Sequence, residues 1–367
     1  MRILWFNWRD LKNPEAGGAE VFTHEVMTRL QGRGYDQTLF TSQFTNSLNQ
    51  EYVDGIKIIR DGTRYSVYGK AKHYYRQNKG KYDLVVDEIN ARPFLTPKFV
   101  KEANILALCH QIIKEIWYSE VFFPLNFICS NYLERKWLSY YKAIPTITVS
   151  NSSKEDLSAM GLKRVFEVPQ GLSIKPLRHL EQKEPNPTIV FLGRIKKYKL
   201  PHHAISAFKL IKKHIPNAKL WIIGDGNALQ ELKETNHNHD ITFYGHVDNG
   251  LKYHLLAKAH LTLVPAVREG WGLVVTESNA MGTPVIGYDV PGLRDSIKDG
   301  KNGILVRDNS PDGLARSAIS LLTNEDLLLR YSNNALEYSR LFSWDKTADA
   351  FEDVLRNTCT KKQLVHA

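Results

Sequence analysis

Short apolar runs alternate along the chain with longer segments in which apolar residues recur every three or four positions. The first pattern is typical of buried strands and the second of amphipathic helices, so the alternation predicts an α/β fold with parallel sheets. In the first half we expect strands at Arg2–Phe6, Gln37–Thr41, Ile56–Ile59, Leu84–Asp87, Ile105–Cys109, Phe127–Cys129 and Thr146–Val149. In the second half we expect them at Thr188–Leu192, Lys219–Ile223, Ile241–Tyr244, Leu261–Pro265, Val285–Tyr288 and Gly303–Val306.

A segment rich in proline and charge separates the two series of strands. Residues 173–187 have the composition of a linker between domains. At 367 residues the chain is also longer than one hydrophobic core usually supports. We therefore place an N-terminal domain at residues 1–174, a C-terminal domain at residues 175–342, and a last helix within residues 343–367.

Composition narrows the class of protein only slightly. With 43% hydrophobic and 24% charged residues, the chain is neither a disordered nor a fibrous protein. The net charge of +10 suits nucleic acid, an anionic membrane or phosphorylated ligands as partners, and it does not indicate a fold. Three cysteines that are far apart and outside any Cys-x2-Cys pattern indicate reduced thiols, not disulfides or a zinc site.

The sequence shows no sorting signal. The apolar stretch at Arg2–Phe6 is too short for a signal peptide. The run from Val121 to Cys129 is broken by Pro124 and Asn126 and is far shorter than the roughly 20 residues of a membrane span. We expect a cytoplasmic protein, either free or peripheral on the inner membrane face.

The most informative motif is a pair of glutamates eight positions apart, Glu269 and Glu277, in the sequence EGWGLVVTE. A helix beginning near Gly270 would direct unpaired backbone N–H groups and the positive end of its dipole toward an anion such as phosphate. Carboxylates beside that helix start suit the hydroxyl groups of a sugar. An amphipathic helix with two solvated glutamates explains the same pattern, so the motif alone leaves both interpretations open.

Two cations follow the first strand of the second half. Arg194 and Lys199 lie in the loop after Thr188–Leu192, at the carboxyl end of that strand. A guanidinium group with a nearby ammonium can clamp a diphosphate. A solvated basic loop is the alternative, since Lys196 and Lys197 lie between them.

Four sequence blocks occur in an order that is more specific than any one of them. They are Gly193-Arg194-Ile195 with Lys199, then Ile223 to Gly226, then the glutamate pair, then Asn279 to Ile286. Further matches follow at Gly292–Asp295 and Asn302–Val306, and weaker ones lie at Gly17–Glu20, His110 and Pro169–Gly171. Together these blocks resemble the retaining, nucleotide-sugar-dependent glycosyltransferases of family 4, also called group 1. The resemblance implies the GT-B fold, in which two Rossmann-like domains face each other across a cleft and the last helix crosses back to the first domain.

The resemblance also implies roles for the charged residues of the second half. Arg194 and Lys199 would hold the distal phosphate of the donor and stabilise negative charge as the nucleotide leaves, in place of a metal ion. Glu269 would bind hydroxyl groups of the transferred sugar. Glu277 would bind the ribose of the nucleotide.

Several uncharged residues join this predicted donor site. Gly270, Trp271, Gly272 and Leu273 would bind the donor, with backbone N–H groups of the first three on the diphosphate. Gly224 would line the side of the base. The chain departs from the family pattern at Leu200, where a glycine is usual, and at Trp271, where phenylalanine is commoner.

Two positions of the first half are weaker candidates. Gly17 and Gly18 end the loop after the first strand and open a helix, where a phosphate or sugar can bind. A plain helix start explains them as well. The connection from Trp8 to Glu15 is a long segment that could move over the site. His110 follows the strand Ile105–Cys109 and matches a histidine that contacts the donor sugar in the family, although a buried core histidine is the usual case.

We therefore expect a retaining transferase that moves a hexose from a UDP- or GDP-sugar to a hydroxyl of an acceptor sugar or a lipid-linked acceptor. Neither a cofactor beyond the donor nor a metal is expected, because no D-x-D pair lies at a strand end. A sugar-nucleotide epimerase of the same fold is one alternative. A non-catalytic basic module that binds membrane or nucleic acid is the other, although the leading reading includes no nucleic-acid partner.

Basic and aromatic residues alternate in Lys57–Lys81 and again in Arg135–Lys142. Such segments suit an anionic bilayer or a lipid-phosphate acceptor. Ordinary solvated helix faces have the same composition, so the sequence supports both interpretations. An anionic membrane surface is therefore one expected partner of the first domain.

Overall fold

The computed structural model describes residues 1–363, which form two domains. The first comprises residues 1–114, 124–171 and the chain from Ser343 on, and the second comprises residues 115–123 and 172–342. The sequence alone assigns residues 115–123 to the first domain, whereas in the structure this short segment packs with the second. None of the helices in the described part has the length and apolar character that crossing a bilayer requires.

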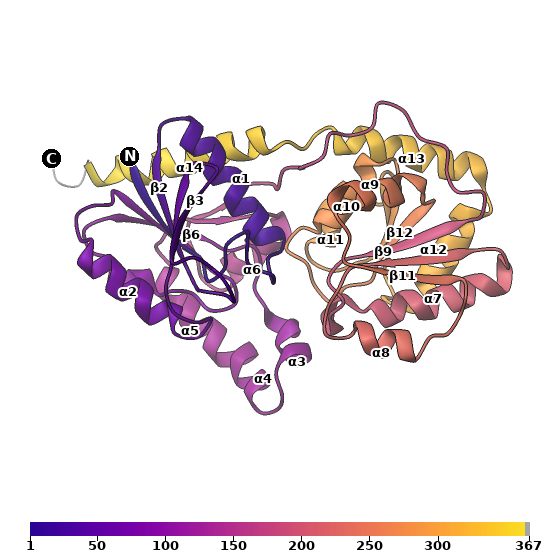
Figure 1. The fold of residues 1–367 in the computed structure, drawn as a ribbon, viewed down its shortest axis with the longest axis horizontal. Helices are drawn as coiled ribbons and strands as arrows, with labels where there is room; N and C mark the ends of the chain where they lie inside the picture. Colours follow the sequence, from indigo (N-terminus) through magenta and orange to yellow (C-terminus); the bar gives the residue numbers. More distant parts are fainter. Residues whose placement is uncertain (364–367) are drawn as a thin grey trace. The chain divides into compact units, whose positions relative to one another are not determined.

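The first domain is built on an eight-stranded sheet in the order β3-β4-β2-β1-β5-β6-β7-β8 (Figure 1). All neighbouring strands are parallel except β3 and β4. The central strands are apolar and buried, as expected for a sheet covered on both faces. The strands are β1 (Arg2–Phe6), β2 (Asp36–Thr41), β3 (Gln50–Val53), β4 (Ile56–Arg60), β5 (Leu84–Glu88), β6 (Asn104–Leu108), β7 (Thr146–Thr148) and β8 (Val165–Glu167).

The strands β3 and β8 are absent from the sequence prediction. Strand β3 pairs with β4 as a hairpin with the two-residue loop Asp54-Gly55, and both loop residues have positive φ, +48° and +80°. Such a loop favours Asp-Gly because L-residues other than Asn and Asp rarely adopt this conformation. The Asp-Gly pair before Ile56 is therefore the signal in the sequence that indicates this strand.

The helices of the first domain include one from the end of the chain. The aromatic ring of Phe351 on this last helix, α14, stacks on Trp5 of β1 with ring centroids 5.3 Å apart. Arg33, just after α1, forms ion pairs with Asp349 and Glu352 of α14, both at 2.6 Å. The main helices are α1 (Gly18–Gly32), α2 (Val67–Gln77), α6 (Asn151–Ala159) and α14 (Trp344–Gln363), with a short turn η1 (Thr96–Lys98).

The expected strand at Phe127–Cys129 is wrong, because the backbone there is helical. From Leu125 to Tyr141 four short helical elements follow each other without a break. A short apolar run does not by itself distinguish a strand from a helix, and here no neighbouring strand pairs with it in the sheet. These elements are α4 (Leu125–Ile128), the π-helical η3 (Cys129–Leu133), α5 (Glu134–Leu138) and η4 (Ser139–Tyr141).

The second domain has a six-stranded, fully parallel sheet in the order β11-β10-β9-β12-β13-β14. Every strand expected in this half is found within one residue of its observed ends. The strands are β9 (Thr188–Leu192), β10 (Lys219–Ile223), β11 (Ile241–Gly245), β12 (Leu261–Val264), β13 (Val285–Tyr288) and β14 (Gly303–Val306).

Helices alternate with these strands, so the second domain is also Rossmann-like (Figure 1). Its core joins the inner faces of the strands to apolar residues of α7 and α12. The helices are α7 (Pro201–His214), α8 (Leu229–Glu234), α9 (Asn249–Lys258), α10 (Leu273–Ala280), α11 (Leu293–Ser296), α12 (Pro311–Leu322) and α13 (Glu325–Ser339). Two shorter elements, η2 (Lys114–Ile116) and α3 (Trp117–Glu120), precede the boundary at Phe123, and η5 (Lys197–Lys199) follows β9.

Each sheet has one point at which the direction of strand succession reverses. In the first sheet it lies between β1 and β5, and in the second between β9 and β12. Open α/β sheets bind ligands beyond the carboxyl ends of the strands at such a switch point. The loops that follow these four strands are therefore where a site is expected in each domain.

Candidate functional site

The loop after β9 brings two cations to the carboxyl end of the second sheet. Arg194 lies two residues after β9, and Lys199 ends the turn η5. Between them, the hydroxyl of the buried Tyr198 accepts a hydrogen bond from Nη2 of Arg194 at 3.0 Å. The carbonyl of Tyr198 accepts a second bond, from the N–H of Val267 at 2.9 Å, so this loop is tied to the loop after β12.

An ion pair joins the two loops at the switch point itself. Nζ of Lys199 donates a hydrogen bond to Oε1 of Glu269, and the exposed fractions of the two side chains are 18% and 12%. Burial alone lowers the pKa of Lys199, but the Glu269 carboxylate outweighs it, so this pKa lies above its ordinary value. The ammonium is therefore charged, and Glu269 takes only one of its three N–H donors.

A glycine in the loop after β13 fixes the backbone of Glu269. The N–H of Glu269 donates to the carbonyl of Pro291 at 3.1 Å. Gly292 has φ +82°, and a Cβ on it would lie 2.2 Å from the carbonyl oxygen of Glu269. Only glycine fits at this position, which gives a physical reason for part of the match at Gly292–Asp295.

Helix α10 begins at Leu273, three residues later than the position near Gly270 that the sequence indicates. Gly272 precedes it with φ +89°, a conformation that glycine adopts without strain. The first N–H groups of such a helix have no partners within it and can bind an anion. Trp271 is buried against Phe342, and within residues 1–363 its indole N–H has no hydrogen-bond acceptor.

The second glutamate of the motif has a separate cation. Glu277 lies on α10 and accepts a hydrogen bond from Nζ of Lys252 on α9 at 2.7 Å and one from the hydroxyl of Tyr253 at 3.3 Å. Burial, and then the nearby Glu277 carboxylate, raise the pKa of Tyr253, so its hydroxyl remains a donor. The structure thus brings Lys199 and Glu269 into contact. Glu277 belongs to a separate ion pair, with Lys252.

Gly224 has a packing role in the structure. It follows β10 with φ +132°, and a Cβ on it would lie 1.9 Å from the carbonyl oxygen of Gly193. This close approach of the loops after β9 and β10 also brings Gly226 against Ile195, where a Cβ would lie 2.4 Å from the carbonyl oxygen. The contact of Gly224 with a donor base stays a prediction.

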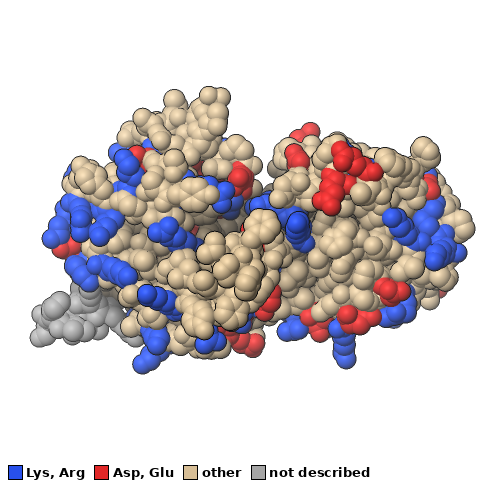
Figure 2. Space-filling model, turned by 90° about the horizontal axis from the view of Figure 1, so that it is seen from below, with Lys and Arg blue, Asp and Glu red and all other residues tan. Residues whose placement is uncertain are grey.

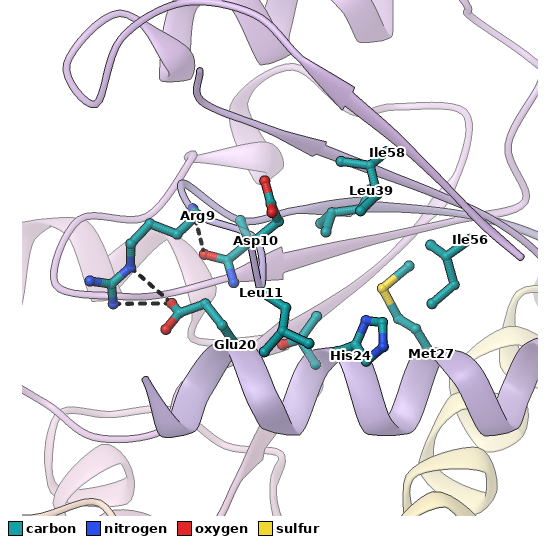
Figure 3. Close-up of a pocket in the computed structure, with 11 residues that line it drawn as sticks. Arg9, Asp10, Leu11, Glu20, His24, Met27, Leu39, Ile56 and Ile58 are labelled. Carbon is teal, nitrogen blue, oxygen red and sulfur yellow. Dashed lines mark hydrogen bonds and ion pairs between the residues drawn. The ribbon is translucent and has the colours of Figure 1, made fainter. Parts of the chain in front are cut away.

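In the first domain the expected glycines lie at the start of α1. Gly17 is the N-cap residue of α1, and Gly18 is its first residue. The N–H of Gly17 donates to Oε2 of Glu20 at 2.7 Å, and the guanidinium of Arg9 forms an ion pair with the same carboxylate at 3.0 Å (Figure 3). Burial raises the pKa of Glu20, against the opposing effect of Arg9.

The connection from Trp8 to Glu15 is held by buried ion pairs. Asp10 binds the guanidinium of Arg60 through both carboxylate oxygens, at 2.6 and 3.0 Å, and neither side chain is exposed by more than 1%. Figure 3 shows Arg9 reaching toward Glu20 beside α1, so a second residue of the connection is also anchored. The structure therefore gives no support to a freely moving segment over the site.

A polar cluster that the sequence does not reveal lies at the switch point of the first sheet. Nδ2 of Asn90 donates to Oδ1 of Asn7 at 3.1 Å and to Oε1 of Glu88 at 3.2 Å. The hydroxyl of Thr23 on α1 donates to the other oxygen of Glu88 at 2.5 Å. Asn7 follows β1, Glu88 ends β5, Asn90 follows β5, and Thr23 lies on α1. None of them belongs to a motif that could be recognised in the sequence.

His110 joins this cluster from the loop after β6. Its Nε2 lies 3.4 Å from Oε1 of Glu88, and its ring packs edge-on against Phe22 with centroids 5.1 Å apart. Neither ring nitrogen makes a hydrogen bond within residues 1–363, and the same holds for Nδ2 of the buried Asn7. His110 therefore differs from a hydrogen-bonded core histidine, because its buried polar atoms remain to be satisfied by a ligand.

The first basic and aromatic segment, Lys57–Lys81, presents a mixed surface at Arg64 and Tyr65 but not along α2. Arg60 is fully buried in the ion pairs just described, and Tyr75 is also buried. The hydroxyls of Tyr74 and Tyr82 bond to each other at 2.8 Å. The exposed residues of α2 include its basic ones but none of its tyrosines, so this helix offers charge without the interleaved tyrosines that the sequence suggests.

Comparison with known proteins concerns the second domain most directly. The family model described as Glycosyl transferases group 1 matches residues 177–338. The phosphatidyl-myo-inositol mannosyltransferase of Mycobacterium leprae is 29% identical over 242 residues, and the match covers 63% of each chain. In three curated relatives, this one included, the match spans 60%, 23% and 63% of their lengths.

Solved structures resemble the whole chain. Sucrose-phosphate synthase of Thermosynechococcus elongatus matches 97% of this chain and 98% of its own, with a TM-score of 0.78 and 18% identity. The Anabaena protein HepE, solved in complex with UDP-glucose, matches 97% of this chain and 100% of its own, with a TM-score of 0.73 and 16% identity. At these identities the likeness concerns the fold alone.

Proposed function

The group 1 glycosyltransferase model matches residues 177–338 and the chain shares the fold of solved glycosyltransferase structures, and on this basis we propose that it is a retaining hexosyltransferase. It moves a hexose from a UDP- or GDP-sugar to an acceptor hydroxyl. The observation that carries the proposal is the Lys199–Glu269 pair at the switch point of the second sheet. This pair sets a charged ammonium beside a carboxylate, which suits a ligand that carries both phosphate and sugar hydroxyls.

The second domain binds the donor through groups that are already in place. Lys199 directs its remaining N–H donors, and Arg194 its guanidinium, to the distal phosphate, while the start of α10 receives the diphosphate. Glu269 accepts hydrogen bonds from sugar hydroxyls. Glu277 binds the ribose, and Lys252 holds that carboxylate in an ion pair.

The reaction needs stabilisation of negative charge on the departing nucleotide. The acceptor oxygen forms a bond to the anomeric carbon as the bond from that carbon to the phosphate oxygen breaks, with attack on the face from which the nucleotide leaves. The proton of the acceptor hydroxyl passes to the departing phosphate oxygen, which is the base nearest to it on that face. Arg194 and Lys199 stabilise that oxygen, an electrostatic role that needs no metal ion.

The first domain binds the acceptor at its own switch point. Asn7, Glu88, Asn90 and His110 offer carboxylate, amide and imidazole groups to hydroxyls there. The mannosyltransferase from Mycobacterium leprae is named for a lipid acceptor, which supports a lipid-linked acceptor and a peripheral membrane location for this chain. We assign to His110, in addition, the contact with the donor sugar that the family resemblance implies.

A panel of nucleotide sugars tests the proposal. We expect UDP- or GDP-hexoses to be hydrolysed slowly without acceptor and faster with one, and UDP-glucose is the first donor to try. Proton NMR of the product gives the anomeric configuration, which is expected to equal that of the donor. Activity is expected to survive EDTA.

Three results of the same panel would contradict the proposal. An inverted anomer would exclude retention, and loss of activity on chelation that magnesium or manganese restores would exclude metal independence. Interconversion of two nucleotide sugars without transfer would favour the epimerase of the same fold.

A further inference from the structure

Apolar side chains are exposed in one short segment. Of the sixteen large hydrophobic side chains that are exposed in residues 1–363, seven lie between Tyr118 and Tyr132. Phe122 and Phe123 are 91% and 81% exposed, and the other five are Tyr118, Leu125, Phe127, Ile128 and Tyr132. An exposed apolar cluster of this kind marks an interaction surface, because single exposed hydrophobics are normally scattered.

The helical run from Leu125 to Tyr141 is firmly attached to the first domain by its inner face. The carboxylate of Glu134 accepts the N–H groups of Ile113 and Lys114 at 2.6 and 3.0 Å. Tyr141, at the end of the run, donates its hydroxyl to the buried Asp87. The outer face is therefore exposed on an anchored element and not on a loose end of the fold.

The outer face changes in character along the run. Its first part is apolar, with Leu125, Phe127 and Ile128, and we call these three residues, all of the first domain, the apolar tip. Its second part carries exposed tyrosines, Tyr132 and Tyr140, and the exposed cations Arg135, Lys136 and Lys142, which we call the basic rim. An apolar end followed by tyrosines and then cations is the order in which a protein surface meets acyl chains, interface and headgroups.

Charge on this surface has one sign. Residues 121–150 contain a single acidic residue, Glu134, and it is buried. Nζ of Lys98 adds a further cation, 3.9 Å from the centre of the Tyr140 ring. Figure 2 views the molecule from the side of α4, and on the first domain blue Lys and Arg patches there prevail over red ones and border a broad uncharged area.

We propose that the apolar tip and the basic rim form a docking surface for an anionic lipid bilayer. The tip enters the boundary of the acyl chains, the tyrosines lie at the interface, and the rim contacts anionic headgroups. This inference rests on the proposed function, since it supplies the membrane at which a lipid-linked acceptor is met. It also moves the membrane contact away from α2, whose tyrosines are turned inward.

The segment that precedes the apolar tip, residues 115–123, belongs to the second domain. Within the second domain, Nε of Arg268 donates to Oε2 of Glu115 at 2.8 Å, and Arg268 precedes Glu269 in the chain. Helix α3 packs against the turn η5, which ends in Lys199. The chain that enters the apolar tip is therefore attached to both halves of the Lys199–Glu269 pair.

Sedimentation with phosphatidylglycerol and phosphatidylcholine vesicles tests the proposal. The phenylalanine variant, Leu125→Ser with Phe127→Ser, is expected to bind phosphatidylglycerol vesicles at least about tenfold more weakly, because each buried apolar side chain contributes roughly that factor. The matched control is Tyr52→Ser with Leu329→Ser, which removes two side chains of 66% and 55% exposure elsewhere and is expected to bind like wild type.

Charge variants separate the basic rim from α2. Arg135→Gln with Lys136→Gln is expected to weaken binding to phosphatidylglycerol but not to phosphatidylcholine, with less effect at high salt. Replacing Lys70, Lys72, Arg76 and Lys79 together by glutamine is expected to have the smaller effect, although it removes twice the charge. The opposite order, or equal binding by wild type and the phenylalanine variant, would overturn the proposal.

Two further measurements keep this inference distinct from the proposed function. Donor hydrolysis without vesicles is expected to be the same in wild type and the phenylalanine variant. If neither protein hydrolyses a donor but wild type still binds vesicles, the proposed function is contradicted and the docking surface is not. Sedimentation velocity tests the other occupant of an apolar surface, a second copy of the chain. If wild type forms a dimer, the phenylalanine variant does not, and neither protein binds vesicles, the apolar surface is a subunit interface and the bilayer proposal is wrong.

Discussion

The switch points of the two sheets carry ion pairs that differ in accessibility. In the first domain, the side chains of Arg60 and Asp10 are at most 1% exposed, and the pair holds the connection after β1 to β4. In the second domain, Lys199 and Glu269 keep exposed fractions of 18% and 12% on loops that are themselves fixed by hydrogen bonds. Equivalent places in two similar sheets thus hold ion pairs of different accessibility.

The difference separates structural charge from functional charge. A fully buried pair has its carboxylate satisfied by the protein alone, and removing one partner leaves the other without compensation. A pair that retains solvent access can exchange part of its bonding for a ligand. We therefore expect substitutions at the first switch point to act on stability and those at the second to act on turnover.

The largest effect is expected for Arg60→Ala. This change leaves the Asp10 carboxylate buried without its cation, which destabilises by about 3–5 kcal/mol in comparable cases. Urea unfolding followed through the buried Trp5 of the same domain measures the loss. Lys57→Ala on the same strand is the control, and it is expected to stay within about 0.5 kcal/mol of wild type.

Unfolding of Arg60→Ala at the wild-type urea concentration would show that the buried pair does not hold the first domain. The proposed structural role of the ion pair at the first switch point would then be wrong. A large loss for Lys57→Ala as well would point instead to a general sensitivity of β4.

At the second switch point, Lys199→Ala and Glu269→Ala are each expected to lower turnover at least about a hundredfold, the range for loss of one preorganised charge-stabilising group. The fold should persist, since both side chains reach solvent. Donor turnover and circular dichroism measure the two effects. Lys197→Ala, an exposed lysine in the same turn, is the control that should retain activity.

The double variant sharpens the comparison. Because the two side chains form one pair, their losses are expected not to add. Near-normal turnover in both single variants would show that the site does not lie at this switch point.

These two cases also show what the sequence predicts well. The second domain could be predicted almost to the residue, because its site residues lie in contiguous blocks and its strands are uninterrupted apolar runs. Glycine patterns there report close approaches of backbone, as at Gly292 and Gly224. Such constraints act on neighbouring residues, so they can be recognised as motifs in the sequence.

The first domain was less predictable because its determinants come from separate segments. Asn7, Glu88, Asn90 and His110 lie at or just beyond the ends of three different strands, and no spacing in the sequence brings them together. The pairing of Asp10 with Arg60 likewise depends on the neighbouring strands β1, β2 and β4. Arg60 looks like one member of a basic run until the tertiary structure shows that it is buried.

A smaller effect is expected at an ion cluster between α1 and α14. Partial burial raises the pKa of Glu352, but hydrogen bonds from Tyr35, Arg33 and Arg356 outweigh it and hold this pKa at about 2. A pKa below that of the unfolded chain adds stability that is complete above about pH 4.5 and is lost as the pH falls toward 2. Allowing for solvent screening, we expect about 1–2 kcal/mol at pH 7.

Glu352→Gln tests this sign. The variant should be less stable than wild type at pH 7, and the difference should shrink at pH 3, as measured by urea unfolding at both values. Asp353→Asn removes the exposed neighbouring charge and is the control. A difference that stays constant between pH 7 and pH 3 would mean that ionisation of Glu352 does not contribute.

The smallest effect concerns Leu200, at which the sequence departs from the family pattern of glycine. Leu200 has φ +50° and ψ +46°, the left-handed conformation, which costs a residue with a Cβ about 1–2 kcal/mol. Its half-buried side chain packs against the core of the second domain and offsets part of this cost. Leu200→Gly removes both the backbone strain and the side-chain packing, and it is expected to change the free energy of unfolding by less than about 1 kcal/mol.

Leu200→Ala separates the two terms, because alanine loses the packing but keeps the strain. It is therefore expected to be less stable than the glycine variant by about 1 kcal/mol, the reverse of the usual order of alanine and glycine. Urea unfolding of the second domain measures this difference. If alanine proves the more stable, the backbone at Leu200 leaves the left-handed region in solution, and the turn that places Lys199 beside Glu269 is looser than the ion pairs of the first domain.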